Sequence, residues 1–227
     1  MRNPPLFPAF VSQHSVNFDK DAPDLGAQFP GIALPESLGR AVPKRKAEFL
    51  AGRFCVREVL RRLAPEHAEI PVGTGKNREP LWPDGFVGAI THTLDFASVA
   101  IARARDAHGI GLDAERVMTD DNAERLLDKI ASPQEIAQMK RKTGWGTGVA
   151  LTVTFSAKES VFKCLYPQVQ RYFDFSDAWI EILDGERFSA RLLSTLTPSL
   201  TAGRTFEGRF EHDAVSVCTG MVVTPST

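Results

Sequence analysis

Two acidic side chains separated by one residue offer the first possible chemistry. Asp113-Ala114-Glu115 follows the largely apolar run from Gly109 to Leu112. Because successive residues of a strand point to opposite faces, Asp113 and Glu115 would share one face, about 7 Å apart along the strand. Oxygen ligands at such a spacing can bind one hard cation such as Mg²⁺. The pair can equally be two solvated acids at a strand end, which is the commoner situation.

A second group lies in the segment FSAKESVFK, residues 155–163. If a helix begins at Ser156, Glu159 is its capping-box residue and has a structural role. If the helix instead runs through, Glu159 and Lys163 lie one turn apart on a shared face. There they could form an ordinary exposed salt bridge, worth about 0.3–0.5 kcal/mol.

The third group is a concentration of positive charge in a chain whose formal net charge is only −1. Its members are Arg40, Lys44, Arg45, Lys46, Arg53, Arg57, Arg61 and Arg62, with Glu48 and Glu58 as the acids of the same span. Such a run is usually a solvated helix face. It is also a credible anion site, because guanidinium groups suit forked contacts to phosphate.

His92 follows a predicted strand and precedes a turn, a position where ligands are often bound, although a lone histidine is more often structural. The other histidines, His14, His67, His108 and His212, lack the ligand spacing of a zinc site.

The elements that must position these groups follow from periodicity and from Gly, Pro and capping residues. Helices are predicted at 44–63 after Pro43, from Asp120 or Asp121 to about 130, after Ser132 with Glu135 completing a capping box, and through 155–166 with an end at Pro167. Strands are predicted at 86–91, 96–102, 109–115, 173–183, 186–196 and 205–223. Residues 1–43 are rich in proline, with one or two short strands, and residues 73–83 form a loop. The order indicates an α+β fold.

Composition narrows the class of protein. The chain has 227 residues, 43% hydrophobic and 24% charged, which is typical of a folded globular protein. Its three cysteines provide no disulfide framework. No apolar run approaches the roughly 20 residues of a membrane span. The N-terminus shows no basic region leading into an apolar stretch. We therefore expect a soluble, cytoplasmic protein in a reducing compartment.

The order of these motifs is more specific than any one of them. The basic helix, REPLWPDG, ITH, GLDAE and FSAKESVFK together resemble the 4′-phosphopantetheinyl transferases. The closest likeness is to the group of enterobactin synthetase component D and its actinobacterial relatives, over about residues 40–183. The resemblance implies two similar α/β subdomains with a pseudo-twofold relation, residues 1–108 and 109–227, and an active site in the cleft between them.

The resemblance also implies the reaction. Such enzymes transfer the phosphopantetheine arm of coenzyme A to a serine of an apo-acyl or apo-peptidyl carrier protein and release 3′,5′-ADP. It implies Mg²⁺ bound by Asp113, Glu115 and Glu159, with Glu159 also the general base. Lys163 would contact the pyrophosphate of coenzyme A directly. Asp113 would bind the pyrophosphate indirectly, by holding the Mg²⁺ ion against it. The residues implied for the 3′-phosphate, neighbouring phosphates and adenosine are Arg45, Arg53, Thr91, His92, Lys76, Asn77, Arg78, Glu79 and Pro80.

The chain departs from the family pattern at four places, one of which is Thr93 after His92, where many members have Ser or Thr with Cys around the histidine. Arg78-Glu79-Pro80 stands where many members have Gly-Lys/Glu-Pro, so the phosphate contact of that loop falls to Arg78 or Lys76. Glu48 stands where surfactin-type members have arginine, and Ala114 is smaller than the usual residue between the two acids.

Two other functions remain open from the residues alone: a non-catalytic anion- or nucleic-acid-binding module built on the 40–62 helix, and a metal-dependent phosphohydrolase. The resemblance favours a monomer that binds no nucleic acid and serves siderophore, polyketide or other secondary-metabolite carriers.

Overall fold

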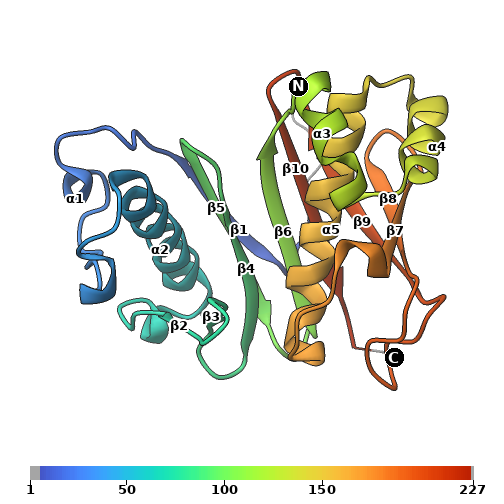
Figure 1. Cartoon of the computed structure of the whole chain (residues 1–227). Helices are drawn as coiled ribbons and strands as arrows, with labels where there is room; N and C mark the ends of the chain where they lie inside the picture. Colours follow the sequence, from blue (N-terminus) through green and yellow to red (C-terminus); the bar gives the residue numbers. More distant parts are fainter. Residues whose placement is uncertain (1–5, 226–227) are drawn as a thin grey trace. The chain divides into compact units, whose positions relative to one another are not determined.

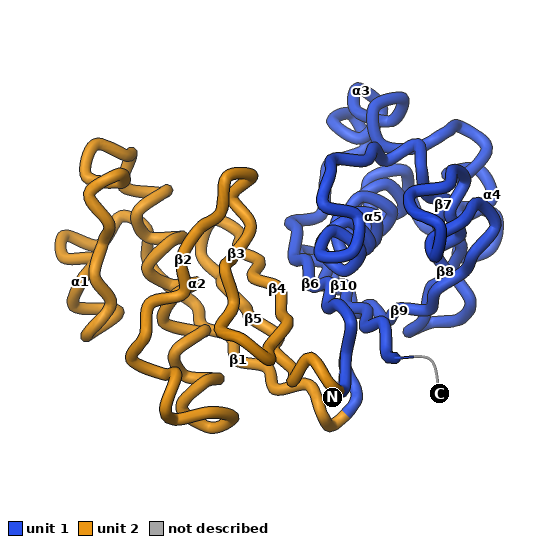
Figure 2. The backbone as a smooth tube through the Cα atoms, turned by 90° about the horizontal axis from the view of Figure 1, so that it is seen from below, with its two compact units in different colours: residues 1–8, 106–227 blue, residues 9–105 orange. Residues whose placement is uncertain are grey.

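The computed structural model describes residues 6–225, which divide into two compact units (Figure 2). One unit is residues 9–105, and the other joins residues 1–8 to residues 106–227. Residues 1–5 belong to the N-terminal stretch that was inspected in the sequence for a basic region before an apolar one, and they lie outside the described residues. Within the described residues, none of the helices has the length and apolar character needed to cross a membrane.

In the 9–105 unit, a long helix lies across one face of a small antiparallel sheet (Figure 1). The sheet has the order β1-β5-β4, formed by β1 (Ser12–Asn17), β5 (Phe96–Arg103) and β4 (Phe86–His92), and the helix is α2 (Pro43–Leu63). Pro43 occupies the first turn of α2, where its missing N–H costs nothing. Short elements complete the unit: α1 (Leu25–Gln28), η1 (Glu36–Leu38), η2 (Pro65–His67), β2 (Gly73–Thr74) and β3 (Pro80–Leu81).

The other unit has a five-stranded antiparallel sheet of order β6-β10-β9-β8-β7. Its strands are β6 (Gly109–Arg116), β7 (Ala178–Ile182), β8 (Arg187–Leu192), β9 (Thr205–His212) and β10 (Ser216–Val223), and its helices are α3 (Asp120–Ile130), α4 (Pro133–Thr143), α5 (Thr147–Val169) and the single turn η3 (Phe175–Asp177). Helix α5 packs on β6 and β10, and its inward residues form the core of this unit with α3, α4 and the sheet (Figure 1).

Mixed helix and sheet are therefore confirmed, with most predicted elements in place. Helix α5 is the main correction, because it begins at Thr147 and passes through Pro167 to end at Val169. The threonines at 152 and 154 do not break it, since their hydroxyls donate to the carbonyls of Gly148 and Ala150 at 2.7 and 2.9 Å. A helix starting at Ser156 is wrong, and Glu159 caps nothing.

The other corrections are smaller. Predicted strand 205–223 is two strands, β9 and β10, separated where the carboxylate of Asp213 accepts from the backbone N–H groups of Val215 and Ser216. Predicted strand 173–183 starts only at Ala178, after η3. Loop 73–83 contains the short β2–β3 pair. Ser132 caps α4 as predicted, but the carboxylate of Glu135 bonds elsewhere, to Lys158 and to the N–H of Ile180.

Candidate active site

Strand β6 and helix α5 approach so closely that only glycine fits between them. A Cβ at Gly111 would lie 1.9 Å from the carbonyl oxygen of Ser160, and one at Gly109 would lie 2.0 Å from that of Cys164. Strand alternation places Asp113 and Glu115 on the same face of β6 as these glycines. The GLDAE segment thus brings two carboxylates against α5.

Helix α5 contributes Glu159 and Lys163 to this place. The ammonium of Lys163 donates to Asp113 Oδ1 at 2.7 Å and to the carbonyl oxygen of Leu112 at 3.1 Å. Asp113 is buried, with 3% of its surface exposed, whereas Glu115, Glu159 and Lys163 are half-buried. We call these four residues, Asp113, Glu115, Glu159 and Lys163, the acidic site.

Negative charge exceeds positive charge in the acidic site. The pKa of Glu115 is raised to about 7, mainly by burial and further by the charges of Asp113 and Glu159, while Lys163 opposes the shift. Burial also raises the pKa of Glu159, with Lys163 opposing and Asp113 adding to the shift. Three carboxyl groups that interact with one lysine favour an added cation, because the cation relieves their repulsion.

The donor chemistry of the acidic site fits Mg²⁺, which prefers carboxylate oxygens. Across residues 6–225, however, no three His, Cys, Asp or Glu side chains are already arranged as the ligands of a metal ion. The lysine–aspartate bond occupies one of the carboxylate oxygens that such a site would use.

The 9–105 unit gathers cations around one buried acid. Glu48, on α2, has its carboxylate oxygens 3.6 Å from Lys44 Nζ, 3.7 Å from Arg45 Nη1 and 3.7 Å from His92 Nδ1. Its side chain is 8% exposed. Glu48 thereby connects the first turns of α2 to the end of β4.

Arg53 lies further along α2, where it is packed as well as bonded. Its Nη2 donates to the carbonyl oxygen of Gly73 at 3.1 Å and to Thr74 Oγ1 at 3.0 Å, and its guanidinium lies 4.9 Å from the centre of the Phe49 ring. Burial, and to a smaller extent the charge of Arg45, lower the pKa of Arg53 to about 10. The two arginines are close enough to repel, which favours an anion beside them. We call Arg45, Glu48, Arg53 and His92 the cationic site.

The 76–80 segment forms the turn between β2 and β3. The side chain of Glu79 folds back over the turn, and its Oε2 accepts from the N–H of Asn77 at 2.8 Å. Arg78 takes a left-handed backbone conformation with φ of 68°. Lys76, Asn77 and Arg78 are exposed, whereas Glu79 and Pro80 are half-buried. The carboxylate of Glu79 thus serves the turn itself.

The predicted residues therefore fall into two groups, one in each unit. Thr91 is the exception on β4, because alternation turns its buried side chain to the sheet face opposite His92. Sequence reasoning missed Glu48, Thr74 and the glycines of β6. Glu48 is one of only two acids among the eight cations, which was the available signal for it, and the spacing Gly-x-Gly-x-Asp-x-Glu was the signal for the glycines.

Comparison with known proteins finds a related family model for each of the two units. Residues 34–102 match the 4′-phosphopantetheinyl transferase N-terminal domain, and residues 109–217 match the 4′-phosphopantetheinyl transferase superfamily. The chain is 35% identical to 4′-phosphopantetheinyl transferase Svp of Streptomyces mobaraensis, over 96% of this chain and 87% of that protein.

Two further relatives show similar identity. One is 4′-phosphopantetheinyl transferase PptT of Mycobacterium tuberculosis, at 34% over 86% of this chain and 88% of the relative. The other is enterobactin synthase component D of Salmonella typhi, at 35% over 81% of this chain and 74% of the relative.

Proposed function

Because this chain belongs to the 4′-phosphopantetheinyl transferase superfamily, we propose that it transfers the phosphopantetheine arm of coenzyme A to a serine of an apo-carrier protein, with release of 3′,5′-ADP. The observation that carries this function is the acidic site: a lysine held at 2.7 Å from Asp113, one helical turn from Glu159. That arrangement places a charge-stabilising cation and a basic carboxylate side by side.

In the reaction, the serine oxygen attacks the phosphorus that bears the pantetheine arm. The new P–O bond forms while the bond to the 3′,5′-ADP oxygen breaks. Glu159 is the catalytic base that accepts the serine proton, directly or through water, since serine is a weak nucleophile at its free pKa. The raised pKa of Glu159 makes it a better proton acceptor than an exposed carboxylate. Lys163 contacts the pyrophosphate and stabilises the developing charge.

Asp113, Glu115 and Glu159 are the residues that would hold Mg²⁺. The metal would supply charge neutralisation at the pyrophosphate. The excess of negative charge in the acidic site supports this assignment.

The cationic site takes the phosphates of the nucleotide end of coenzyme A. Arg45, Arg53 and His92 contact the 3′-phosphate and its neighbours, and Glu48 orients Arg45 and His92. Thr91 and the 76–80 turn belong to the same nucleotide-binding set, in which Lys76 or Arg78 supplies the phosphate contact and Glu79 keeps the turn in shape. This assignment makes residues 1–108 the nucleotide-binding subdomain and 109–227 the catalytic one, with a pseudo-twofold relation and coenzyme A in the cleft between them.

The partner is an acyl or peptidyl carrier protein. Relatives named enterobactin synthase component D favour carriers of siderophore and other secondary-metabolite synthesis. We propose that the protein acts in the cytoplasm, where its carriers and coenzyme A are found. We also propose that it is a monomer.

Mass spectrometry tests the proposal. The chain is incubated with coenzyme A, Mg²⁺ and a panel of unrelated apo-carriers, and each carrier is examined for the phosphopantetheine mass gain. A gain that depends on the carrier's serine is expected. Breakdown of coenzyme A without any gain would instead indicate a phosphohydrolase, and an unchanged carrier with intact coenzyme A would refute transfer.

A further inference from the structure

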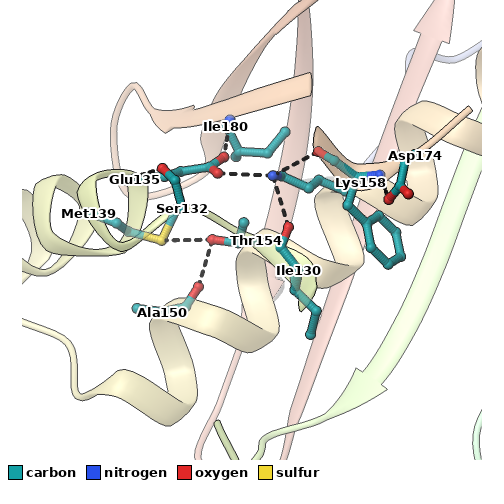
Figure 3. Close-up of polar contacts among 10 residues, drawn as sticks. Ile130, Ser132, Glu135, Met139, Ala150, Thr154, Lys158, Asp174 and Ile180 are labelled. Carbon is teal, nitrogen blue, oxygen red and sulfur yellow. Dashed lines mark hydrogen bonds and ion pairs between the residues drawn. The ribbon is translucent and has the colours of Figure 1, made fainter. Parts of the chain in front are cut away.

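Helix α5 carries a buried ion pair immediately before Glu159. Lys158 is 3% exposed, and its Nζ donates to Glu135 Oε2 at 2.9 Å and to the carbonyl oxygens of Ile130 and Phe175, each at 3.0 Å (Figure 3). All three donors of the ammonium are therefore satisfied. Glu135 Oε1 accepts from the N–H of Ile180 at 2.6 Å.

This network joins four parts of the catalytic unit to α5. Ile130 is the last residue of α3, Glu135 lies in the first turn of α4, Phe175 begins η3, and Ile180 lies in β7. Figure 3 shows Lys158 reaching away from its helix towards these elements. Lys158 thus links α5 directly to α3, α4 and η3, and through Glu135 to β7.

Stability alone does not account for such a pair. Removing two charges from water costs free energy, and well-packed apolar replacements are often as stable or more stable. Burial lowers the pKa of Lys158, although the charge of Glu135 opposes that change. What an apolar replacement loses is direction: hydrogen bonds fix the rotation of a helix, whereas apolar contacts tolerate small rotations.

The neighbouring positions show why rotation matters here. On another side of α5, the hydroxyls of Ser156 and Ser160 lie 3.0 and 2.7 Å from Thr219 Oγ1 on β10. Lys163, about two helical turns after Ser156, lies on that same side of α5 and reaches the neighbouring strand β6. Since consecutive helical residues are about 100° apart, the direction of Lys158 determines the direction of Glu159.

We propose that the Lys158–Glu135 pair is a positioning device that sets the rotation of α5 and so aims Glu159 and Lys163 at Asp113. The catalytic part of this inference rests on the proposed transferase function. Lys158 touches no reacting group in this arrangement, so it is a positioning residue.

The main test is a neutral pair, Lys158→Met with Glu135→Gln. The glutamine keeps an oxygen for the N–H of Ile180, and methionine keeps the length of the lysine stem. The matched control is Leu192→Ala, which removes buried side-chain volume from β8 in the same core without touching the polar network. The melting temperature of both variants is measured first. Their kcat and KM for coenzyme A are then measured at a temperature where both are folded.

The neutral pair should lower kcat by about tenfold or more, with the KM for coenzyme A changed by less than about twofold, because a small misplacement affects the chemical step most. The control, Leu192→Ala, should have a lower melting temperature and an unchanged kcat. If the neutral pair fails to fold, Glu135→Gln alone replaces it, with a kcat loss of about two- to fivefold expected. A folded neutral pair, or the folded single variant, with wild-type kcat would overturn the proposal.

Crystal structures separate this inference from the proposed function. In the neutral pair the bond between Lys163 Nζ and Asp113 Oδ1, 2.7 Å in the wild type, should lengthen or break, and in Leu192→Ala it should persist. This readout needs no enzymatic activity. An unchanged bond in the neutral pair would refute positioning even if the wild type transferred no phosphopantetheine.

Discussion

The acidic site and the cationic site share one arrangement of helix and sheet, but the contacts within the acidic site are closer. Each depends on a long helix that lies on one face of an antiparallel sheet. In the acidic site the helix backbone touches the strand backbone, and the lysine–aspartate bond is 2.7 Å long. In the cationic site the charges around Glu48 stand 3.6–3.7 Å from it, and the 76–80 side chains are mostly exposed.

The difference corresponds to the two tasks of the proposed reaction. Proton transfer and displacement at phosphorus need atoms placed to within a fraction of an ångström, which close backbone packing provides. Binding a phosphate needs concentrated positive charge, which acts over longer distances and tolerates side-chain movement. Substitutions in the acidic site should therefore reduce kcat, and those in the cationic site should raise KM.

The largest effect is expected from the carboxylates themselves. Glu159→Ala or Asp113→Ala should reduce transfer by about 10²–10⁴-fold, the range for removing a general base. Melting temperature should stay near the wild-type value, because each change also relieves repulsion among crowded acids. The exposed Glu124→Ala on α3 is the control and should keep full activity. Full activity in either site variant would contradict the assignment.

Close packing of β6 against α5 gives the next effect. In Gly111→Ala the new methyl group collides with the carbonyl of Ser160, so α5 must move away from the strand. A shift near 1 Å can cost about 100-fold in rate, and overpacking of this kind destabilises by about 1–3 kcal/mol. Gly185→Ala, where a Cβ meets no atom within 4 Å, is the matched control. Denaturant unfolding measures the loss of stability, and single-turnover rates measure the loss of activity. Wild-type kinetics in Gly111→Ala would show that close contact between β6 and α5 is not required.

For the cationic site, Arg53→Ala should raise the KM for coenzyme A by about 10- to 150-fold, the loss expected for a charged hydrogen bond, with kcat little changed. Dephospho-coenzyme A, which lacks the 3′-phosphate, should then bind the variant as well as coenzyme A does. Arg61→Ala is the control, since Arg61 is exposed on the same helix and paired with Glu58 and Glu69. If the variant still prefers coenzyme A as strongly as the wild type does, Arg53 contacts another group.

These residues also show how far sequence reasoning reaches. Local signals located the helices, the strands and the motif residues, because periodicity and caps act over a few positions. Glu135 and Glu159 were both candidates for capping boxes, and neither side chain caps a helix. The reasons differ. Glu135 bonds the distant Lys158 and Ile180 instead, whereas Glu159 lies in mid-helix because α5 begins at Thr147.

The same limit explains why Glu48 went unnoticed as a site residue. Its contact with His92 crosses from α2 to β4, a pairing set by how the helix lies on the sheet. The glycine at 52, whose added Cβ would be 3.1 Å from Ile90, helps to set that approach. No short-range pattern encodes it.

The raised pKa of Glu115, to about 7, predicts a pH effect on stability without metal. Between its usual value near 4.5 and about 7, the folded state binds more protons than the unfolded state, so stability falls as pH rises through this window. In EDTA the melting temperature should drop by about 3 °C or more from this group between pH 5 and 7.5. Glu115→Gln should flatten that drop, and added Mg²⁺ should oppose it most at the higher pH. An equal drop in both proteins would remove Glu115 as its source.

The smallest effect is expected at the surface that meets the carrier. A carrier that is acidic around its modified serine would be attracted to exposed cations of the catalytic unit, so these cations are candidates for docking. Lys140 and Lys142 on α4 are less suitable, because Lys140 donates to Thr147 Oγ1 at 2.8 Å and Lys142 lies 3.4 Å from Glu181. Arg141 between them and Arg125 on α3 are exposed.

Charge reversal at both arginines, Arg125→Glu with Arg141→Glu, should slow transfer to an acidic carrier by about threefold to tenfold, since rim charges act mainly on association rate. The KM for coenzyme A should not change, because the cationic site is untouched. The wild-type rate should fall more steeply with added salt than that of the variant. Arg187→Glu with Arg191→Glu, which reverses two exposed charges on β8, is the control for an equal change in net charge. If the control slows the carrier as much as Arg125→Glu with Arg141→Glu does, long-range charge rather than a docking surface on α3 and α4 governs the encounter.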